Sequence, residues 1–202
     1  MKSIEQMLTA MHQREKIPPS LHRATIRTRL LESFPETNLA VFETRIGWVG
    51  IVFSDRGIIT LHLPRVSRAH ALRNLQNEFP RGVLVAHAPA NIARELREYA
   101  LGRRREFDLL LDWSAVKPFQ RAVLLAARTI PFGETRSYGW IAREIGNPRA
   151  SRAVGQALHN NPVPIIVPCH RVLASNGGLG GYAGGLELKR KLLELEGVAL
   201  EA

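Results

Sequence analysis

The chain has a single cysteine among its 202 residues, and this scarcity excludes several classes of protein. One thiol cannot form an internal disulfide, and structural zinc sites usually combine several cysteine or cysteine and histidine ligands. The histidines of the N-terminal half are scattered without metal-ligand spacing: His12, His22, His62, His70 and His87. We therefore expect no bound metal and no cofactor.

Long apolar runs are missing as well. No stretch approaches the roughly 18 to 20 apolar residues that a membrane-spanning helix needs. The segment Met1 to Arg14 lacks the apolar core of a secretory signal peptide. We expect a soluble, cytoplasmic protein without a membrane partner.

Acidic residues are absent between Glu144 and Glu187, in a chain with 28 lysines and arginines, 18 acidic residues and a formal net charge of +10. The basic side chains inside this interval are Arg149, Arg152, His159, His170 and Arg171. A basic surface without carboxylates suits contact with a polyanion such as nucleic acid, although a merely basic protein without such a partner remains the alternative.

The one cysteine lies in a proline-rich stretch, residues 161–172. Proline fixes its own φ angle and biases the residue before it to extended geometry, so the stretch predicts a stiff, extended segment that presents Cys169. A thiol is a nucleophile only as thiolate, and the nearest groups that could favour this form are His170 and Arg171. A lone cysteine is also often just a small buried apolar residue.

Two short motifs decide between these interpretations. Pro168-Cys169-His170-Arg171-Val172, with Asn161-Pro162-Val163-Pro164 upstream, resembles the active site of the 6-O-alkylguanine-DNA alkyltransferases, the methylated-DNA-protein-cysteine methyltransferases. The likeness extends from about Phe119 to Gly197, and more faintly over Phe42 to Pro64. The resemblance implies an α/β N-terminal domain, a small sheet with flanking helices that is ribonuclease H-like. It also implies a mainly α C-terminal domain with a helix-turn-helix, which is winged-helix-like.

The sequence pattern divides the chain into three parts: a helical extension over residues 1–36, an α/β domain over 37–112 and a mainly helical domain over 113–202. The resemblance implies that the last of these is the DNA-binding, alkyl-accepting domain. In the extension, apolar residues at helical spacing predict a helix over residues 4–11 and a second, basic helix over Ser20–Glu32. In the α/β domain we expect strands at Ala40–Phe53, Gly57–Leu63 and Val83–Ala86, with helices at Arg68–Glu78 and Asn91–Leu101.

Three helices are expected in the last part, at Phe119–Ala127, Ser137–Ile145 and Arg149–His159. Gly146 suits a helix C-cap, Asn147 an N-cap and Pro148 a first helical position, which together predict a helix-turn-helix. Many such helix pairs never touch DNA, and the small residues of the second helix suit close approach to a partner or tight internal packing equally well.

The resemblance assigns a DNA partner to this helix pair. It implies that the second helix enters the minor groove of double-stranded DNA containing alkylated guanine, that the target nucleotide is flipped out, and that Arg152 fills the vacated space in the base stack. The protein is expected to act as a monomer. The predicted DNA contacts are Arg149, Ser151, Arg152, Ala153, Gly155 and Arg171.

The resemblance also assigns the chemistry. Cys169 accepts the alkyl group, His170 acts as base through a water, Glu196 orients that histidine, and Asn161 ties the recognition helix to the active-site turn. Tyr182, from the glycine-rich loop over residues 175–185, packs on the guanine. The predicted lining of the base pocket is Tyr138, Leu158, Pro164, Val172, Tyr182 and Ala183. Lys189 matches a lysine near the site, and the resemblance leaves its role open.

The implied function is direct reversal of DNA damage, by one irreversible transfer of an alkyl group from 6-O-alkylguanine, and from 4-O-alkylthymine, to Cys169. Two other classes stay open. A non-catalytic module could sense alkylated DNA with the same architecture. A cysteine hydrolase would also use cysteine and histidine, but it normally needs a distant histidine and an oxyanion hole, and the sequence suggests neither.

Overall fold

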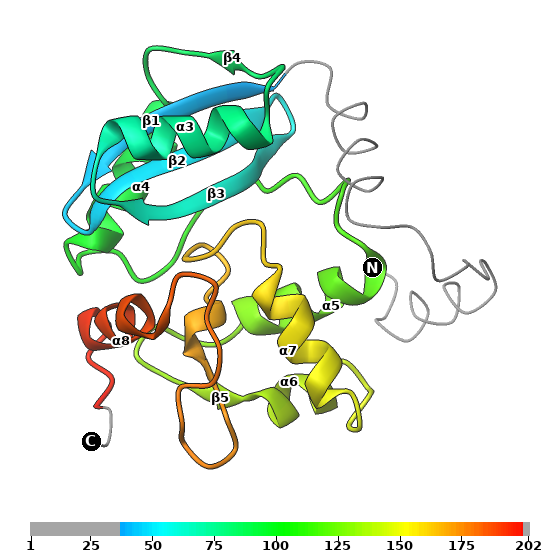
Figure 1. Cartoon of the computed structure of the whole chain (residues 1–202). Coiled ribbons are helices and arrows are strands. Elements are labelled where there is room, and N and C mark those ends of the chain that lie inside the picture. The colour runs from blue at the N-terminus through cyan, green and yellow to red at the C-terminus, as the bar shows by residue number, and fades with distance from the viewer. Residues whose placement is uncertain (1–36, 200–202) are drawn as a thin grey trace. The chain divides into compact units, whose positions relative to one another are not determined.

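The computed structural model describes residues 37–199, which belong to the compact unit Glu36–Ala202. The predicted helical extension over residues 1–36, with helices over residues 4–11 and Ser20–Glu32, lies outside the described residues. Within them, a small mixed sheet with two helices is followed by a mainly helical part (Figure 1).

The sheet has four strands in the order β3-β2-β1-β4. Strands β1 (Asn38–Thr44), β2 (Gly47–Ser54) and β3 (Gly57–Arg65) form an antiparallel meander, and the short β4 (Val83–Leu84) pairs in parallel with β1. The expected turn after Ser54 is present, since β3 begins at Gly57.

The predicted strand over Ala40–Phe53 is wrong, because β1 and β2 are separate strands that pair through a turn at Arg45 and Ile46. Gly47 closes this turn with a φ of 124°, and a Cβ there would lie 2.9 Å from the backbone oxygen of Arg65. The Thr44 hydroxyl donates to the Gly47 carbonyl at 2.7 Å. Apolar residues continue to alternate through the turn, so the sequence pattern did not reveal the break between the two strands.

Helix α3 (Arg68–Glu78) covers one face of the sheet, and α4 (Ala90–Ala100) lies on the other (Figure 1). The Ser67 side chain caps α3 by accepting from His70 N. The predicted bounds of α3 are confirmed, and those of α4 are off by one residue at each end. Because α4 buries Ile92, Leu96 and Tyr99, it places an aromatic side chain in the interior.

The helical part contains α5 (Pro118–Arg128), α6 (Tyr138–Glu144), α7 (Ser151–His159) and α8 (Leu186–Leu195). A 3-10 turn, η1, begins at the cysteine and spans Cys169–Arg171. It leads into β6 (Val172–Leu173), which pairs in parallel with β5 (Arg136–Ser137). This pairing brings the chain after the cysteine beside the start of α6.

The turn between α6 and α7 differs from the expected one. Gly146 lies one residue beyond its predicted place, because the C-cap of α6 is Ile145 and Gly146 follows it with a φ of 70°. Gly146 N donates to Arg143 O and Asn147 N to Ala142 O, both at 2.9 Å, so the glycine still ends the helix. The predicted N-cap role of Asn147 is wrong, because α7 begins two residues later than expected and its N-cap is Ala150. Pro148 therefore lies in the turn instead of the first helical position.

One continuous apolar core joins the sheet to the helical part. Strand β3 also contacts the stretch before the cysteine, since the Thr60 hydroxyl and the Leu61 amide both donate to the Pro162 carbonyl, at 2.7 and 2.8 Å. The predicted domain boundary at residues 112–113 stays a prediction. The sheet thus supports the segment that carries the cysteine.

Candidate active site

The predicted stiff, extended segment before Cys169 is wrong, because the chain turns sharply at Ile165 and Ile166. Val167 N donates to Val163 O at 2.9 Å, and Ile165 adopts a φ of 74°. The prolines on either side fix only their own φ angles. A left-handed backbone at a non-glycine residue costs about 1–3 kcal/mol and persists only where the surroundings enforce it. Here the buried Ile165 and Ile166 side chains pack into the core and hold the turn.

Cys169 stands at the start of η1 and is 8% exposed. The Asn161 side-chain amide donates from Nδ2 to Cys169 Sγ at 3.2 Å and to Val167 O at 2.9 Å, while its Oδ1 accepts from Val163 N at 3.0 Å. These contacts on both ends fix the amide. Asn161 therefore joins the residues that follow α7 to the segment that carries Cys169.

Burial raises the pKa of the Cys169 thiol above its ordinary value. The Asn161 hydrogen bond and the positive charge of Lys189 oppose that rise without cancelling it. The resting side chain is therefore mainly a protonated thiol. A base must take its proton before the sulfur can act as a nucleophile.

Glu196 and His170 form a buried contact of 2.8 Å between Oε1 and Nε2. Burial alone would raise the pKa of Glu196, but hydrogen bonds and charges of His170 and Arg171 outweigh it and lower this pKa to about 2. A carboxylate only accepts, so Nε2 carries the hydrogen and Nδ1 keeps a lone pair. Nδ1 is buried without a hydrogen-bond partner within residues 37–199.

The His170 pKa is lowered, chiefly by burial, and Glu196 only partly opposes this. The histidine is thus neutral at neutral pH, and the counter-charge of Glu196 is Arg171. A neutral histidine with a free Nδ1 lone pair is the form that can accept a proton.

The structure contradicts the predicted DNA contact of Arg171. Its side chain is buried, with Nε 2.7 Å from Glu196 Oε2, Nη2 3.0 Å from Glu196 Oε1, and Nη1 donating to Ile130 O at 2.7 Å. The guanidinium also lies over the Phe132 ring, 5.7 Å from its centroid. Within the acid-free interval, His170 and Arg171 are therefore unavailable to phosphates.

The remaining predicted DNA contacts lie on the outer side of α7 and its approach. Arg149, Arg152 and Ala153 are exposed, and Ser151 and Gly155 are partly exposed. The opposite side of the helix packs inward through residues that include Leu158, one of the predicted pocket residues. Helix α7 can therefore offer a basic, small-residue face to a partner.

Tyr138 lies between α7 and the glycine-rich loop. Side-chain atoms of Tyr138 would contact a Cβ at Gly155 at 3.7 Å and one at Gly180 at 2.9 Å. Gly180 also has a φ of 63°, in the left-handed region that glycine tolerates. Only glycine lets the loop approach the tyrosine hydroxyl this closely.

The loop also carries Tyr182 and Ala183. The Tyr182 hydroxyl is buried without a hydrogen-bond partner in the described part of the chain, whereas Ala183 is exposed. Burial raises the pKa of Tyr182 well above its usual value, so the hydroxyl stays protonated and can donate. Two further predicted pocket residues, Pro164 and Val172, are buried.

Lys189 joins the glycine-rich loop to the start of β6, just after Cys169. Its buried Nζ donates to Val172 O at 2.6 Å and to Leu179 O, and burial lowers its pKa to about 8. The carbonyl of Val172, one of the predicted pocket residues, thus already accepts one hydrogen bond. A carbonyl has two lone pairs, so a second donor can still bind it.

Sequence reasoning missed Tyr99 entirely. This α4 residue is fully buried, and its hydroxyl donates to Glu196 Oε1 at 2.6 Å. The helical spacing of α4 marks Tyr99 as an inward-facing residue, but nothing local identifies its partner. Gly133 N also approaches Glu196, 3.4 Å from Oε2.

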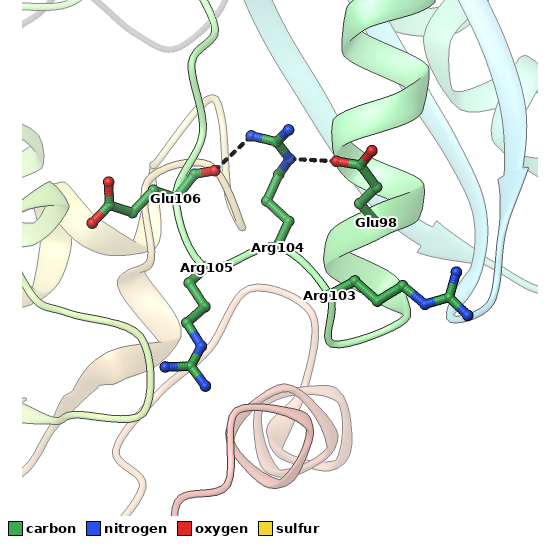
Figure 2. A pocket seen from close by; sticks show the side chains of 5 residues that line it. All are labelled: Glu98, Arg103, Arg104, Arg105 and Glu106. Carbon is green, nitrogen blue, oxygen red and sulfur yellow. Dashed lines mark hydrogen bonds and ion pairs between the residues drawn. The ribbon is translucent and has the colours of Figure 1, made fainter.

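A pocket at the end of α4 is separate from these groups (Figure 2). It is lined by Glu98, Arg103, Arg104, Arg105 and Glu106, and the side chains of Arg103 and Arg105 point in different directions. Arg104 is held by Glu98 Oε2 at 2.7 Å and by Glu106 O at 3.0 Å. The guanidinium groups therefore do not converge on one anion.

Among residues 37–199, no group of three or more histidine, cysteine, aspartate or glutamate side chains could hold a metal ion. In the same range, the helices are too short or too polar to span a membrane.

Comparison with known proteins identifies relatives of this site. The family model for the DNA-binding domain of 6-O-methylguanine DNA methyltransferase matches residues 118–198. A methylated-DNA–protein-cysteine methyltransferase from Methanosarcina acetivorans is 53% identical over 105 residues, which cover 52% of this chain and 67% of the relative. The Mycobacterium tuberculosis protein of the same name is 55% identical over 102 residues, 50% of this chain and 61% of the relative. These sequence matches thus span 61 to 67% of the length of the two curated relatives.

The structural matches are more extensive. The crystal structure of Mycobacterium tuberculosis OGT in complex with DNA has a TM-score of 0.67 and 40% identity, covering 79% of this chain and 92% of that chain. The O6-methylguanine-DNA methyltransferase from Pyrococcus kodakaraensis has a TM-score of 0.64 and 30% identity, covering 79% of this chain and 99% of that one. The chain therefore belongs to the 6-O-methylguanine DNA methyltransferase family.

Proposed function

We propose that this protein repairs DNA by direct reversal, transferring the alkyl group of 6-O-alkylguanine, and of 4-O-alkylthymine, to Cys169 in a single irreversible event. The observation that carries the proposal is the buried cysteine held by Asn161 next to a histidine whose Nε2 is bound to an ionised carboxylate. Relatives named methylated-DNA–protein-cysteine methyltransferase support the same activity.

The chemistry follows from the protonation states. His170 accepts the thiol proton at Nδ1 through a water, and Glu196 stabilises the cation that forms. The thiolate attacks the alkyl carbon in line with the bond to guanine oxygen. A sulfur–carbon bond forms while the carbon–oxygen bond breaks, and the proton removed from the thiol returns to the departing guanine. The thioether product is not readily reversed, so each molecule reacts once.

DNA binding is proposed for the α6–α7 pair, acting as a helix-turn-helix whose second helix enters the minor groove. The exposed Arg149 and Arg152 and the small side chains of α7 support this orientation. Arg152 would fill the stack after the target nucleotide flips into the pocket of Tyr138 and Tyr182. The solved relative in complex with DNA supports a DNA partner.

The finer features of the fold and its setting are proposals as well. We propose a ribonuclease H-like α/β domain over residues 37–112, a winged-helix-like domain over 113–202, action as a monomer and a cytoplasmic location. The sheet with α3 and α4, and the short β5–β6 pair beside α6, support the two domain assignments.

The two alternative classes lack comparable support. A sensing module has no use for a cysteine, yet Cys169 is held by Asn161 beside His170. In a cysteine hydrolase the cysteine contacts its base, whereas His170 Nε2 is directed to Glu196 and Cys169 Sγ accepts from Asn161.

Intact-mass spectrometry after incubation with duplex DNA containing 6-O-methylguanine tests the proposal. We expect the protein to gain one methyl group in place of one hydrogen, on the peptide that contains Cys169, with one transfer per molecule. Unmodified duplex is the matched control. A protein that keeps its mass, or that demethylates many equivalents of DNA, would refute the proposed function.

A further inference from the structure

Tyr99 connects the α/β part of the molecule to the candidate catalytic groups. It lies on α4, is 0% exposed, and donates from its hydroxyl to Glu196 Oε1 at 2.6 Å. The same hydroxyl lies 3.4 Å from His170 Nε2. Its ring packs against Phe107 and Phe132, with centroids 5.4 and 6.3 Å apart. Both the ring and the hydroxyl therefore have defined surroundings.

The Glu196 carboxylate shows what this hydroxyl adds. Oε1 accepts from Tyr99, from His170 and from Arg171 Nη2, while Oε2 accepts from Arg171 Nε and lies 3.4 Å from Gly133 N. Arg171 fixes the plane of the carboxylate from one side. Tyr99, on α4, is a neutral donor to the same oxygen that His170, on η1, contacts. It therefore restricts the position of Oε1.

We propose that Tyr99 is a positioning residue for alkyl transfer: its hydroxyl holds Glu196 Oε1 against His170 Nε2, so that the Nδ1 lone pair stays directed for removal of the Cys169 proton. This inference rests on the proposed function. It gives the α/β part of the chain an indirect role in the chemistry, through Glu196 and His170.

The protonation states fit this role. Burial, followed by the charge of Glu196, raises the pKa of Tyr99 well above its usual value, so the phenol remains a donor at any pH at which the protein works. A hydrogen bond to a charged acceptor is stronger than one between neutral groups. The hydroxyl therefore draws part of the carboxylate charge away from His170.

Loss of the Tyr99 hydroxyl should change the His170 pKa in a predictable direction. Without that donor, Glu196 offers more negative charge to Nε2–H, which favours the protonated imidazole and raises the His170 pKa. The other charged or titratable groups that face His170 are Glu196, Arg171 and Lys189, and Cys169 is its chain neighbour. All of these remain in a Tyr99→Phe variant.

Tyr99→Phe is therefore the test, because it keeps the ring between its aromatic neighbours and removes one oxygen. The matched control is Thr60→Val, which removes another buried hydroxyl that joins the α/β part to the active-site turn, at Pro162 O. Leu61 N still satisfies that carbonyl in the control. Single-turnover rates with free 6-O-benzylguanine and with 6-O-methylguanine duplex would be measured from pH 5 to 9, well below the melting midpoint of each variant.

We expect Tyr99→Phe to lower the rate constant by about tenfold on both substrates, in line with the strength of a hydrogen bond to a charged group. The dissociation constant for duplex DNA should be unchanged. The acidic limb of the pH–rate profile should move to higher pH, because more His170 is protonated there. Thr60→Val should destabilise the protein without moving the profile.

A Tyr99→Phe protein with the wild-type rate and profile would overturn the inference. So would a slower variant whose profile matches the wild type, since that would indicate a purely structural role. Should the variant melt too low for kinetics, the ¹⁵N imidazole shifts of His170 give a second measurement, and an unchanged tautomer and titration would also refute the inference. A wild-type protein that gains no alkyl group would instead refute the proposed function and this inference with it.

Discussion

Replacing Glu196 with glutamine should remove a large and pH-dependent part of the stability of this protein. Glu196 is 4% exposed, and its pKa lies at about 2 against an ordinary value of 4.5. Since one pKa unit corresponds to about 1.4 kcal/mol, the lowered pKa represents about 3 kcal/mol of unfolding free energy at neutral pH. Glutamine also leaves the buried Arg171 guanidinium without a counter-charge, so this value is closer to a minimum.

The direction of the pH dependence follows from the lowered pKa. Stability from Glu196 is fully present above the unfolded pKa near 4.5 and is lost as the pH falls through the folded value of about 2. For a chain of this size, about 3 kcal/mol corresponds to a fall in melting midpoint of about 6 to 12 °C. The variant should therefore melt lower than the wild type at pH 7, and the difference should shrink in acid.

Thermal melts followed by circular dichroism from pH 2 to pH 7 measure both effects. Glu187→Gln is the matched control, because Glu187 forms an exposed pair with Lys191 at 2.7 Å and its side chain is 82% exposed. Such a surface pair contributes little, so the control should melt nearly as the wild type does. Equal melting midpoints for Glu196→Gln and wild type at pH 7 would refute the assignment of Arg171 as the counter-charge.

Three further predictions concern the reaction. Cys169→Ser should abolish alkyl transfer, measured by intact mass, and leave the affinity for alkylated duplex largely intact; residual transfer to the protein would contradict the proposed acceptor. Arg152→Ala should slow reaction with duplex far more than with free 6-O-benzylguanine, which needs no base flipping, and equal losses would indicate a pocket defect. Gly180→Ala should slow both reactions, because a Cβ would lie 2.9 Å from the Tyr138 hydroxyl at a φ of 63°. Gly181→Ala, where a Cβ meets nothing within 4 Å, is its control, and similar losses in both variants would count against a role for Tyr138.

Elements with local signals were predictable from the sequence. The bounds of α3 follow from the Ser67 cap and the helical spacing of its apolar residues. Gly146 ends α6 because a left-handed residue is needed there. Elements defined by contacts across the chain were not predictable. The turn between β1 and β2 requires Gly47 because the Arg65 backbone lies against it, and Arg65 is remote in sequence.

The candidate site shows the same division. Asn161 and His170 were identified through the resemblance of the motif around Cys169 to the alkyltransferase active site. The contacts of Asn161 reach only a few residues along the chain. The left-handed turn at Ile165 was missed because no residue there favours that conformation by itself. The turn forms because the Ile165 and Ile166 side chains are buried in the core, and a local sequence pattern does not predict that burial.

Arg152 and Arg171 show why charge counting alone misleads. Both lie in the acid-free interval, and by sequence both suit a phosphate contact. In the folded chain Arg171 binds Glu196, which lies 25 positions further along the sequence, at 2.7 Å. Burying an arginine is costly unless a partner compensates its charge. Arg171 can be buried because Glu196 supplies that negative charge. Arg152 has no ion pair among the described residues and remains exposed on α7. Which of these arginines is exposed and able to contact a phosphate therefore depends on carboxylates outside the acid-free interval. Arg171 neutralises the charge of Glu196 in the interior, whereas Arg152 stays at the surface.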